Sequence, residues 1–114
     1  MLYRVLIVDD STFYRRRLTS VLEKDSSIQV VGEATNGLEA IRKAIELKPD
    51  VIMMDVEMPV MDGIAAVTKI MQTAPTAILM FSSLTQVGAK VTFDALEAGA
   101  IDFIPKKFDD ISTE

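Results

Sequence analysis

The stretch "RVLIVDDSTFYRRR" at residues 4–17 contains a continuous apolar run that ends at Asp9, and a second carboxylate, Asp10, follows directly. A continuously apolar run is typical of a parallel β-strand that is buried on both faces of its sheet. A buried strand has no evident reason to end in two adjacent negative charges. Either these carboxylates cap the helix that follows, or a positive group lies beside them.

The first apolar run covers residues 3–9, and four more follow at intervals of about 25 residues: 28–34, 51–56, 77–82 and 100–105. The segments between them carry apolar residues three and four positions apart, as at Leu38, Ile41 and Ile45, which predicts helices. The capping signals agree, with expected N-caps at Asp10 or Ser11, Asn36 and Asp62, and a helix end at Gly99.

Strands that alternate with helices predict parallel βαβ units with right-handed crossovers. Polar residues and proline are best tolerated at the edges of a sheet. They occur in the second run, at Gln29 and Glu33, and in the fifth, at Asp102 and Pro105. With these two strands at the edges the order becomes 2-1-3-4-5, so we predict a three-layer α/β fold of the flavodoxin-like class.

The chain is short after the fifth run, because only residues 106–114 follow it, enough for one or two helical turns. We therefore expect the last helix to be short or missing, and the sheet face beside the first helix to be under-covered. We expect one domain over residues 1–107. Residues 108–114 would be a truncated fifth helix or the start of a linker in a longer protein.

The composition excludes several kinds of chemistry. The chain has 114 residues, which suits one domain, and it contains no histidine and no cysteine. A Ser-His-Asp triad, zinc bound by histidine and disulfides are therefore excluded. The net charge of −5 disfavours nucleic acid as the main partner, and we interpret the basic run Arg15–Arg17 as a solvated helix face. No run approaches the roughly 20 apolar residues of a membrane helix, and we expect a cytoplasmic protein.

Five polar side chains follow the ends of neighbouring predicted strands. Asp9 and Asp10 follow the first strand, Asp55 the third, Ser82 the fourth and Lys106 the fifth. The carboxyl ends of parallel strands meet at one edge of a sheet, where ligands bind. Three carboxylates packed together are unfavourable without a cation, and one lysine leaves the group negative. We predict a site for Mg²⁺, or for Mn²⁺ in its place, because these ions prefer oxygen ligands.

This set of residues supports one reaction class. With a metal ion and Lys106 neutralising charge, Asp55 can attack a phosphoryl donor and become an aspartyl phosphate, whose oxygens Ser82 and Lys106 then hold. The donor must be another molecule, because the chain has no histidine. A magnesium-dependent aspartyl phosphatase is a less favoured alternative, because it needs a second aspartate two residues after the nucleophile, where Glu57 stands. A flavin carrier fits less well still, because its phosphate-binding loop would not be acidic.

These residues resemble the receiver domain of two-component response regulators, which has the CheY-like fold. The resemblance covers essentially the whole chain and rests on four motifs in combination: "VDD" at 8–10, "MMDVEMPVMDG" at 53–63, "FSS" at 81–83 and "FIPK" at 103–106. It implies that Asp55 accepts a phosphoryl group from a histidine kinase or a phosphotransfer domain. It also implies a metal ion bound by Asp10, Asp55 and the backbone carbonyl of Glu57, with Asp9 acting partly through water.

The resemblance further implies a switch group formed by Lys106, Ser82 and Phe103. Ser82 would move toward the phosphoryl group while Phe103 repacks inward. Phe103 stands where tyrosine is commoner, so its inward state would rest on packing alone. Glu57 and Leu84 flank the site, and we expect them to set the lifetime of the phosphate, with the apolar Leu84 predicting slow self-hydrolysis.

One position departs from the family pattern. Receivers usually follow the lysine with a proline joined through a cis peptide bond, and Lys107 stands there instead. A cis bond before a non-proline residue costs about 2.5–4 kcal/mol. Either the site bears that cost, or the bond is trans and Lys106 is slightly displaced.

A narrower resemblance concerns "DVEMPVMDG" at 55–63 and "FDALEAGAIDFIPK" at 93–106. These stretches are similar to the receiver of the chemotaxis receptor protein-glutamate methylesterase (CheB type), which implies a methylesterase output domain in the parent. The esterase itself is absent from these residues, since they contain no G-x-S-x-G stretch. The alternative is a stand-alone chemotaxis or signalling regulator that binds a target protein. We expect a monomer or weak dimer that does not bind nucleic acid or membranes through this domain, and no catalysis beyond its own phosphorylation and dephosphorylation.

Overall fold

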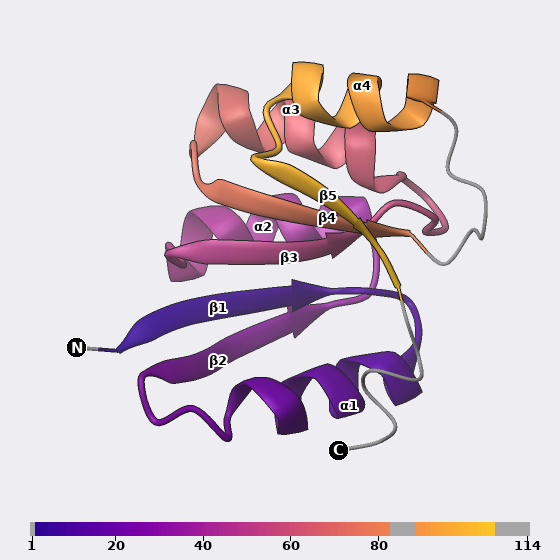
Figure 1. The fold of residues 1–114 in the computed structure, drawn as a ribbon. Helices are drawn as coiled ribbons and strands as arrows, with labels where there is room; N and C mark the ends of the chain where they lie inside the picture. Colours follow the sequence, from indigo (N-terminus) through magenta and orange to yellow (C-terminus); the bar gives the residue numbers. More distant parts are fainter. Residues whose placement is uncertain (1, 83–88, 107–114) are drawn as a thin grey trace.

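The computed structural model describes residues 2–82 and 89–106. Its strands form a single parallel sheet in the order β2-β1-β3-β4-β5, with helices in the connections (Figure 1). The elements are β1 (Tyr3–Val8), α1 (Thr12–Leu22), β2 (Ile28–Ala34), α2 (Gly37–Leu47), β3 (Val51–Asp55), α3 (Gly63–Thr73), β4 (Ala77–Ser82), α4 (Ala89–Ala98) and β5 (Asp102–Pro105). The predicted flavodoxin-like fold and its strand order are confirmed.

Local capping explains where the helices begin and end. Ser11, rather than Asp10, is the N-cap of α1, and its hydroxyl accepts the Tyr14 N–H at 3.1 Å. Asn36 and Asp62 cap α2 and α3 in the same way, as predicted. Gly99 follows α4 with φ of 126°, a conformation that favours glycine. Since Ser11 satisfies the helix end, Asp10 is left for another role.

The strands divide their side chains between two cores, because successive residues point to opposite faces. On β1, Leu6 and Val8 belong to the core shared with α2, α3 and α4, while Val5 and Ile7 belong to the core shared with α1. We call these the three-helix face and the one-helix face. Figure 1 shows α1 on one side of the sheet and the other helices on the opposite side.

Among the described residues, α1 packs on the one-helix face, and the predicted under-coverage of this face stays a prediction. Its buried cluster consists of Val5, Ile7, Tyr14 and Leu18. A hollow of about 380 Å³ lies at this face, lined among others by Leu22, Ile28 and Met53. The predicted short fifth helix, and the division between 1–107 and 108–114, fall on residues outside the described part of the chain.

The strand register brings the ends of neighbouring strands together. Val8 pairs with Met54 across β1 and β3, so the residues that follow them, Asp9 and Asp55, lie side by side. Ser82 pairs with Pro105 across β4 and β5, and the Lys106 backbone N–H donates to the Ser82 carbonyl at 2.7 Å. Parallel pairing therefore places all the predicted rim residues at one edge of the sheet.

Candidate functional site

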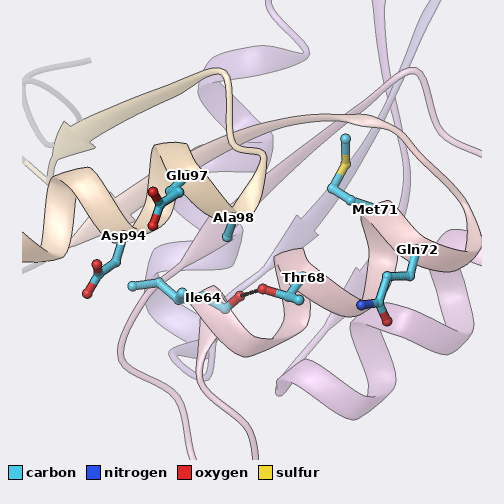
Figure 2. A pocket seen from close by; sticks show the side chains of 7 residues that line it. All are labelled: Ile64, Thr68, Met71, Gln72, Asp94, Glu97 and Ala98. Atoms are coloured by element: carbon cyan, nitrogen blue, oxygen red, sulfur yellow. Dashed lines mark hydrogen bonds between the residues drawn. The ribbon is translucent and has the colours of Figure 1, made fainter.

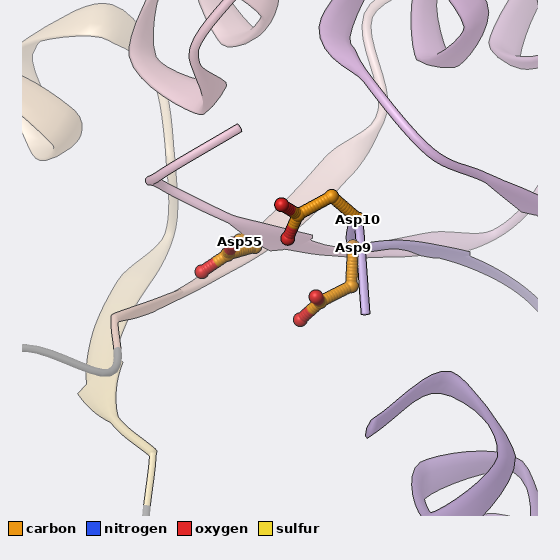
Figure 3. A group of neighbouring side chains, drawn as sticks. All are labelled: Asp9, Asp10 and Asp55. Carbon is orange, nitrogen blue, oxygen red and sulfur yellow. The ribbon is translucent and has the colours of Figure 1, made fainter. Parts of the chain in front are cut away.

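The three aspartates predicted as metal ligands meet at the carboxyl edge of the sheet (Figure 3). Asp9, Asp10 and Asp55 each offer a carboxylate oxygen, and these oxygens lie within 4.8 Å of one another. Asp9 and Asp55 are buried, whereas Asp10 is exposed. The group is therefore an acidic pocket with two deep carboxylates and one at its mouth.

Both carboxylate oxygens of Asp9 already have hydrogen-bond donors. Oδ1 accepts the Ser11 N–H at 2.9 Å, and Oδ2 accepts the Lys106 ammonium at 2.5 Å. The Asp9 N–H donates to the Ala34 carbonyl at 3.0 Å, which extends the pairing of β1 with β2. Asp9 is thus fixed through both its backbone and its carboxylate. Its carboxylate oxygens are less available to a metal ion than those of Asp55.

Asp55 ends β3 and is 4% exposed. Its Oδ1 lies 3.2 Å from the Lys106 nitrogen, but no hydrogen bond of good geometry reaches that buried oxygen. Burial first, and the charge of Asp9 second, raise the pKa of Asp55 to about 7, although the Lys106 charge acts in the opposite direction. A buried carboxylate oxygen without a donor is a position where a cation ligand is stabilising.

Lys106 is the cation of this pocket. Its nitrogen pairs with both Asp9 and Asp55, and its side chain is only 5% exposed. The same nitrogen lies 4.2 Å from the centre of the Tyr14 ring, within the range of a cation–π interaction. Burial, then the charges of Asp9 and Asp55, raise the pKa of Tyr14 to about 12, so its ring remains neutral. Tyr14 thus forms an apolar wall against which the ammonium is held.

Arg15 does not lie on a solvated helix face, so the prediction for the run Arg15–Arg17 is wrong at this position. Its side chain is 12% exposed and donates to the Asp9 carbonyl at 2.7 Å and to Glu33 at 2.7 Å. A third, longer bond reaches the Thr12 hydroxyl at 3.3 Å. Arg15 therefore ties the loop that carries the aspartates to the edge strand β2.

Ser82 is fully buried at the end of β4, and its hydroxyl donates to Oε2 of Glu57 at 2.8 Å. Glu57 belongs to the loop after β3, two residues beyond Asp55. The structure thus brings Ser82 and the Glu57 side chain together, and it leaves the role of the Glu57 backbone carbonyl a prediction.

The loop between β3 and α3 forms the outer wall of the pocket. A hollow of about 650 Å³ lies there, lined among others by Asp10, Glu57 and Pro59. Val60 in this loop has φ of 70°, which a β-branched residue rarely adopts. A Cβ on Gly63 would lie 2.2 Å from the Asp55 carbonyl oxygen, so only glycine lets α3 begin this close to β3.

The roles of two further predicted residues stay predictions. Phe103 is half-buried on β5 and packs against the core of the three-helix face, so its switching role stays a prediction. Leu84 lies outside the described residues, as does the Lys106–Lys107 bond.

A second groove, between α3 and α4, has no lining residue in common with the acidic pocket (Figure 2). Its volume is about 470 Å³, and it is lined by Ile64, Thr68, Met71, Gln72, Asp94, Glu97 and Ala98. Asp94 pairs with Lys90 at 3.1 Å, and the Thr68 hydroxyl donates to the Ile64 carbonyl. Because the acidic pocket brings three carboxylates and a buried lysine together, we place the chemistry at the aspartates.

The sequence matches the family model described as "Response regulator receiver domain" over residues 5–112. The chain belongs to the response regulator receiver domain family. This receiver also resembles solved structures of the family. The response regulator domain of Thermotoga maritima CheB superposes with a TM-score of 0.89 at 54% identity, over 93% of this chain and 79% of that one. The CheX-CheY-BeF3-Mg²⁺ complex from Borrelia burgdorferi matches with a TM-score of 0.85 at 32% identity, over 97% and 83%.

The curated relatives are longer than the receiver. Protein-glutamate methylesterase/protein-glutamine glutaminase 2 of Pseudomonas fluorescens (strain Pf-5) is 66% identical over 112 residues, which are 98% of this chain and 30% of that protein. The protein-glutamate methylesterase/protein-glutamine glutaminase of Pseudoalteromonas atlantica is 62% identical over the same shares. The chain thus spans about 30% of the length of these relatives.

Sequence reasoning missed two residues of the receiver's pocket. The sequence assigned no role at the site to Tyr14, and it indicated Arg15 only as part of a solvated helix face. The available signal was position along the chain, since Tyr14 and Arg15 lie in the first turn of the helix that begins directly after the aspartates.

Proposed function

We propose that this receiver accepts a phosphoryl group on Asp55 from a phosphorylated histidine kinase or phosphotransfer domain. The observation that carries the proposal is the donor-free Asp55 Oδ1, buried beside Lys106 and two further aspartates. Support also comes from the Borrelia relative, which is described as a complex with BeF3 and Mg²⁺.

In the proposed step a carboxylate oxygen of Asp55 attacks the phosphorus of the donor's phosphohistidine. The new P–O bond forms as the P–N bond breaks, and the electron pair stays on the imidazole nitrogen, which takes up a proton. Lys106 lies 3.2 Å from Asp55 and is placed to neutralise charge that builds on the phosphoryl oxygens. Glu57 and Leu84 would influence how long the acyl phosphate survives, by controlling the access of water.

The residues at the rim fit a divalent ion with oxygen ligands. Asp10 and Asp55 have oxygen available, the Glu57 backbone carbonyl is the third proposed ligand, and Asp9 would act partly through water because its oxygens already have donors. When bound, Mg²⁺ or Mn²⁺ supplies charge neutralisation and orients the phosphoryl oxygens. Asp9 would then keep Lys106 in position.

We further propose that the phosphorylated receiver controls a chemotaxis methylesterase output in its parent protein. The 66% identity to such enzymes supports this parent over a stand-alone regulator with a separate target. Ser82 and Phe103 would change position on phosphorylation and alter the surface around α4 and β5. The described residues contain no helix of the length and apolarity needed to cross a bilayer, and we propose a cytoplasmic monomer or weak dimer.

The chemistry is tested by intact-mass measurement after incubation with acetyl phosphate and Mg²⁺. The wild-type protein should gain about 80 Da, the mass of one phosphoryl group, because Asp55 is nucleophilic and the metal neutralises charge. Asp55→Asn should gain nothing, and removal of the metal with a chelator should abolish the gain in the wild type.

Asp62→Asn provides a matched control for this substitution. Asparagine caps helices as well as aspartate does, so α3 should begin normally and the full mass gain should persist. A mass gain that survives in Asp55→Asn would place the phosphoryl group elsewhere and contradict the proposed function.

A further inference from the structure

The hydrogen bond between Ser82 and Glu57 joins the two residues that flank Asp55 in space. Ser82 follows Phe81, the β4 residue that pairs with Asp55, and Glu57 follows Asp55 along the chain. The Ser82 hydroxyl is fully buried, and its oxygen lies 2.8 Å from Glu57 Oε2. Both partners of the bond therefore lie at the carboxyl edge of the sheet, beside the end of the strand that carries Asp55.

A serine hydroxyl carries one proton that it can donate. In this structure that proton goes to a carboxylate, which is a strong acceptor, and the buried hydroxyl would lose free energy without a partner. The same proton is the one that Ser82 would donate to a phosphoryl oxygen. Ser82 cannot make both bonds through one proton, so the two acceptors compete.

We propose that Glu57 is a positioning residue that holds the Ser82 hydroxyl in the resting receiver and thereby opposes the phosphorylated conformation. The inference rests on the proposed phosphorylation of Asp55 and adds a residue that sets its equilibrium. A ligand shifts a two-state balance only by its differential affinity for the two states. Removing the Glu57 acceptor lowers the free energy that the phosphoryl group must supply to move Ser82.

Glu57 also carries a negative charge close to the site, and this charge opposes any incoming anion without involving Ser82. The two effects are separable, because repulsion acts whether or not residue 82 has a hydroxyl. The hydrogen bond acts only when that hydroxyl is present. A double-mutant cycle between the two residues therefore isolates the bond from the charge.

The experiment measures the affinity for beryllofluoride, a stable mimic of the phosphoryl group, at saturating Mg²⁺ in four proteins: wild type, Glu57→Ala, Ser82→Ala and the double variant. In the Ser82 background, Glu57→Ala should raise the affinity about tenfold, the effect of one hydrogen bond to a charged acceptor. In the Ser82→Ala background the same change should raise it less than about twofold, through charge alone. Glu57→Gln, which keeps an acceptor oxygen without the charge, should lie between wild type and Glu57→Ala when Ser82 is present.

Equal effects of Glu57→Ala in both backgrounds would overturn the inference, as would no effect in either. Free energies of unfolding of the four proteins without ligand provide a second readout. They should be non-additive, because each single variant breaks the same bond, and additivity would also overturn the inference. The mass gain of the wild type separates the two proposals: if Asp55 takes up phosphoryl and the cycle shows no coupling, only the role of Glu57 fails.

Discussion

The two faces of the sheet differ in how they are built. On the three-helix face, 15 residues form one buried cluster in which every side chain is apolar. On the one-helix face the buried cluster has four residues within the described part of the chain, and one of them, Tyr14, contacts the ammonium of Lys106. Among the described residues, the three-helix face therefore buries more apolar surface, while the one-helix face contributes a residue directly to the arrangement of the site.

Truncation of a core residue on the three-helix face should have the largest effect on stability. Ile70 is fully buried on α3, so Ile70→Ala should lower the free energy of unfolding by about 2–5 kcal/mol. Leu22→Ala, a similar truncation of a half-buried residue on the one-helix face, should cost clearly less. Urea denaturation followed by circular dichroism measures both. Equal losses would contradict the proposed division between the faces.

For the rate of phosphoryl uptake we expect the opposite order, in which a substitution on the one-helix face, at Tyr14, has the larger effect. Tyr14→Leu removes the aromatic face beneath Lys106, so it should slow phosphoryl uptake from acetyl phosphate about threefold to tenfold, the range of a partly buried cation–π contact. Its cost in stability should be about 1–2 kcal/mol. Tyr14→Phe, which keeps the ring, should react at close to the wild-type rate. If Ile70→Ala slowed uptake as much as Tyr14→Leu at a temperature where both are folded, the comparison would fail.

A further comparison concerns the buried carboxylate of Asp55, which lies at the sheet edge between the two faces. The pKa of Asp55 is raised from 3.8 to about 7 by burial and by Asp9, so between these pH values the folded protein holds a proton that the unfolded chain releases. Stability from this group is therefore fully present below about pH 4 and is lost as the pH rises through about 7. Without metal, Asp55→Asn should melt at a higher temperature than the wild type at pH 8 and close to it at pH 4.

Thermal unfolding in chelator-containing buffers at several pH values measures this difference. Asp62→Asn, at an exposed cap away from Lys106, provides the matched control for loss of a carboxylate outside the pocket. A difference between Asp55→Asn and wild type that did not change with pH would show that Asp55 ionises at its ordinary pKa.

Much of the fold follows from two patterns in the sequence. Continuous apolar runs marked the central strands, and polar residues such as Glu33 and Pro105 marked the edges, so the strand order was predictable. The convergence of Asp9 and Asp55 was predictable for the same reason, because parallel strands end at a common edge. Both inferences depend only on the order and direction of the strands, not on side-chain conformation.

The contacts that the sequence did not reveal depend on side-chain conformation. Arg15 is charged and looks solvent-exposed by type, yet its long side chain folds back to the Asp9 carbonyl. The Ser82–Glu57 bond joins residues 25 positions apart, and neither spacing nor composition specifies which acceptor a hydroxyl selects. Packing decides such choices, and it is visible only once the strands are in place.

The position of Lys106 has a consequence for how the protein matures. Its ammonium is bonded to Asp9 and paired with Asp55, so the polypeptide brings its own counterion to the acidic pocket. We therefore expect newly made chains to reach the native state in a medium depleted of divalent cations, with the proposed ion binding afterwards. On this expectation, the yield of folded receiver would not depend on the supply of magnesium, even though the proposed phosphorylation would.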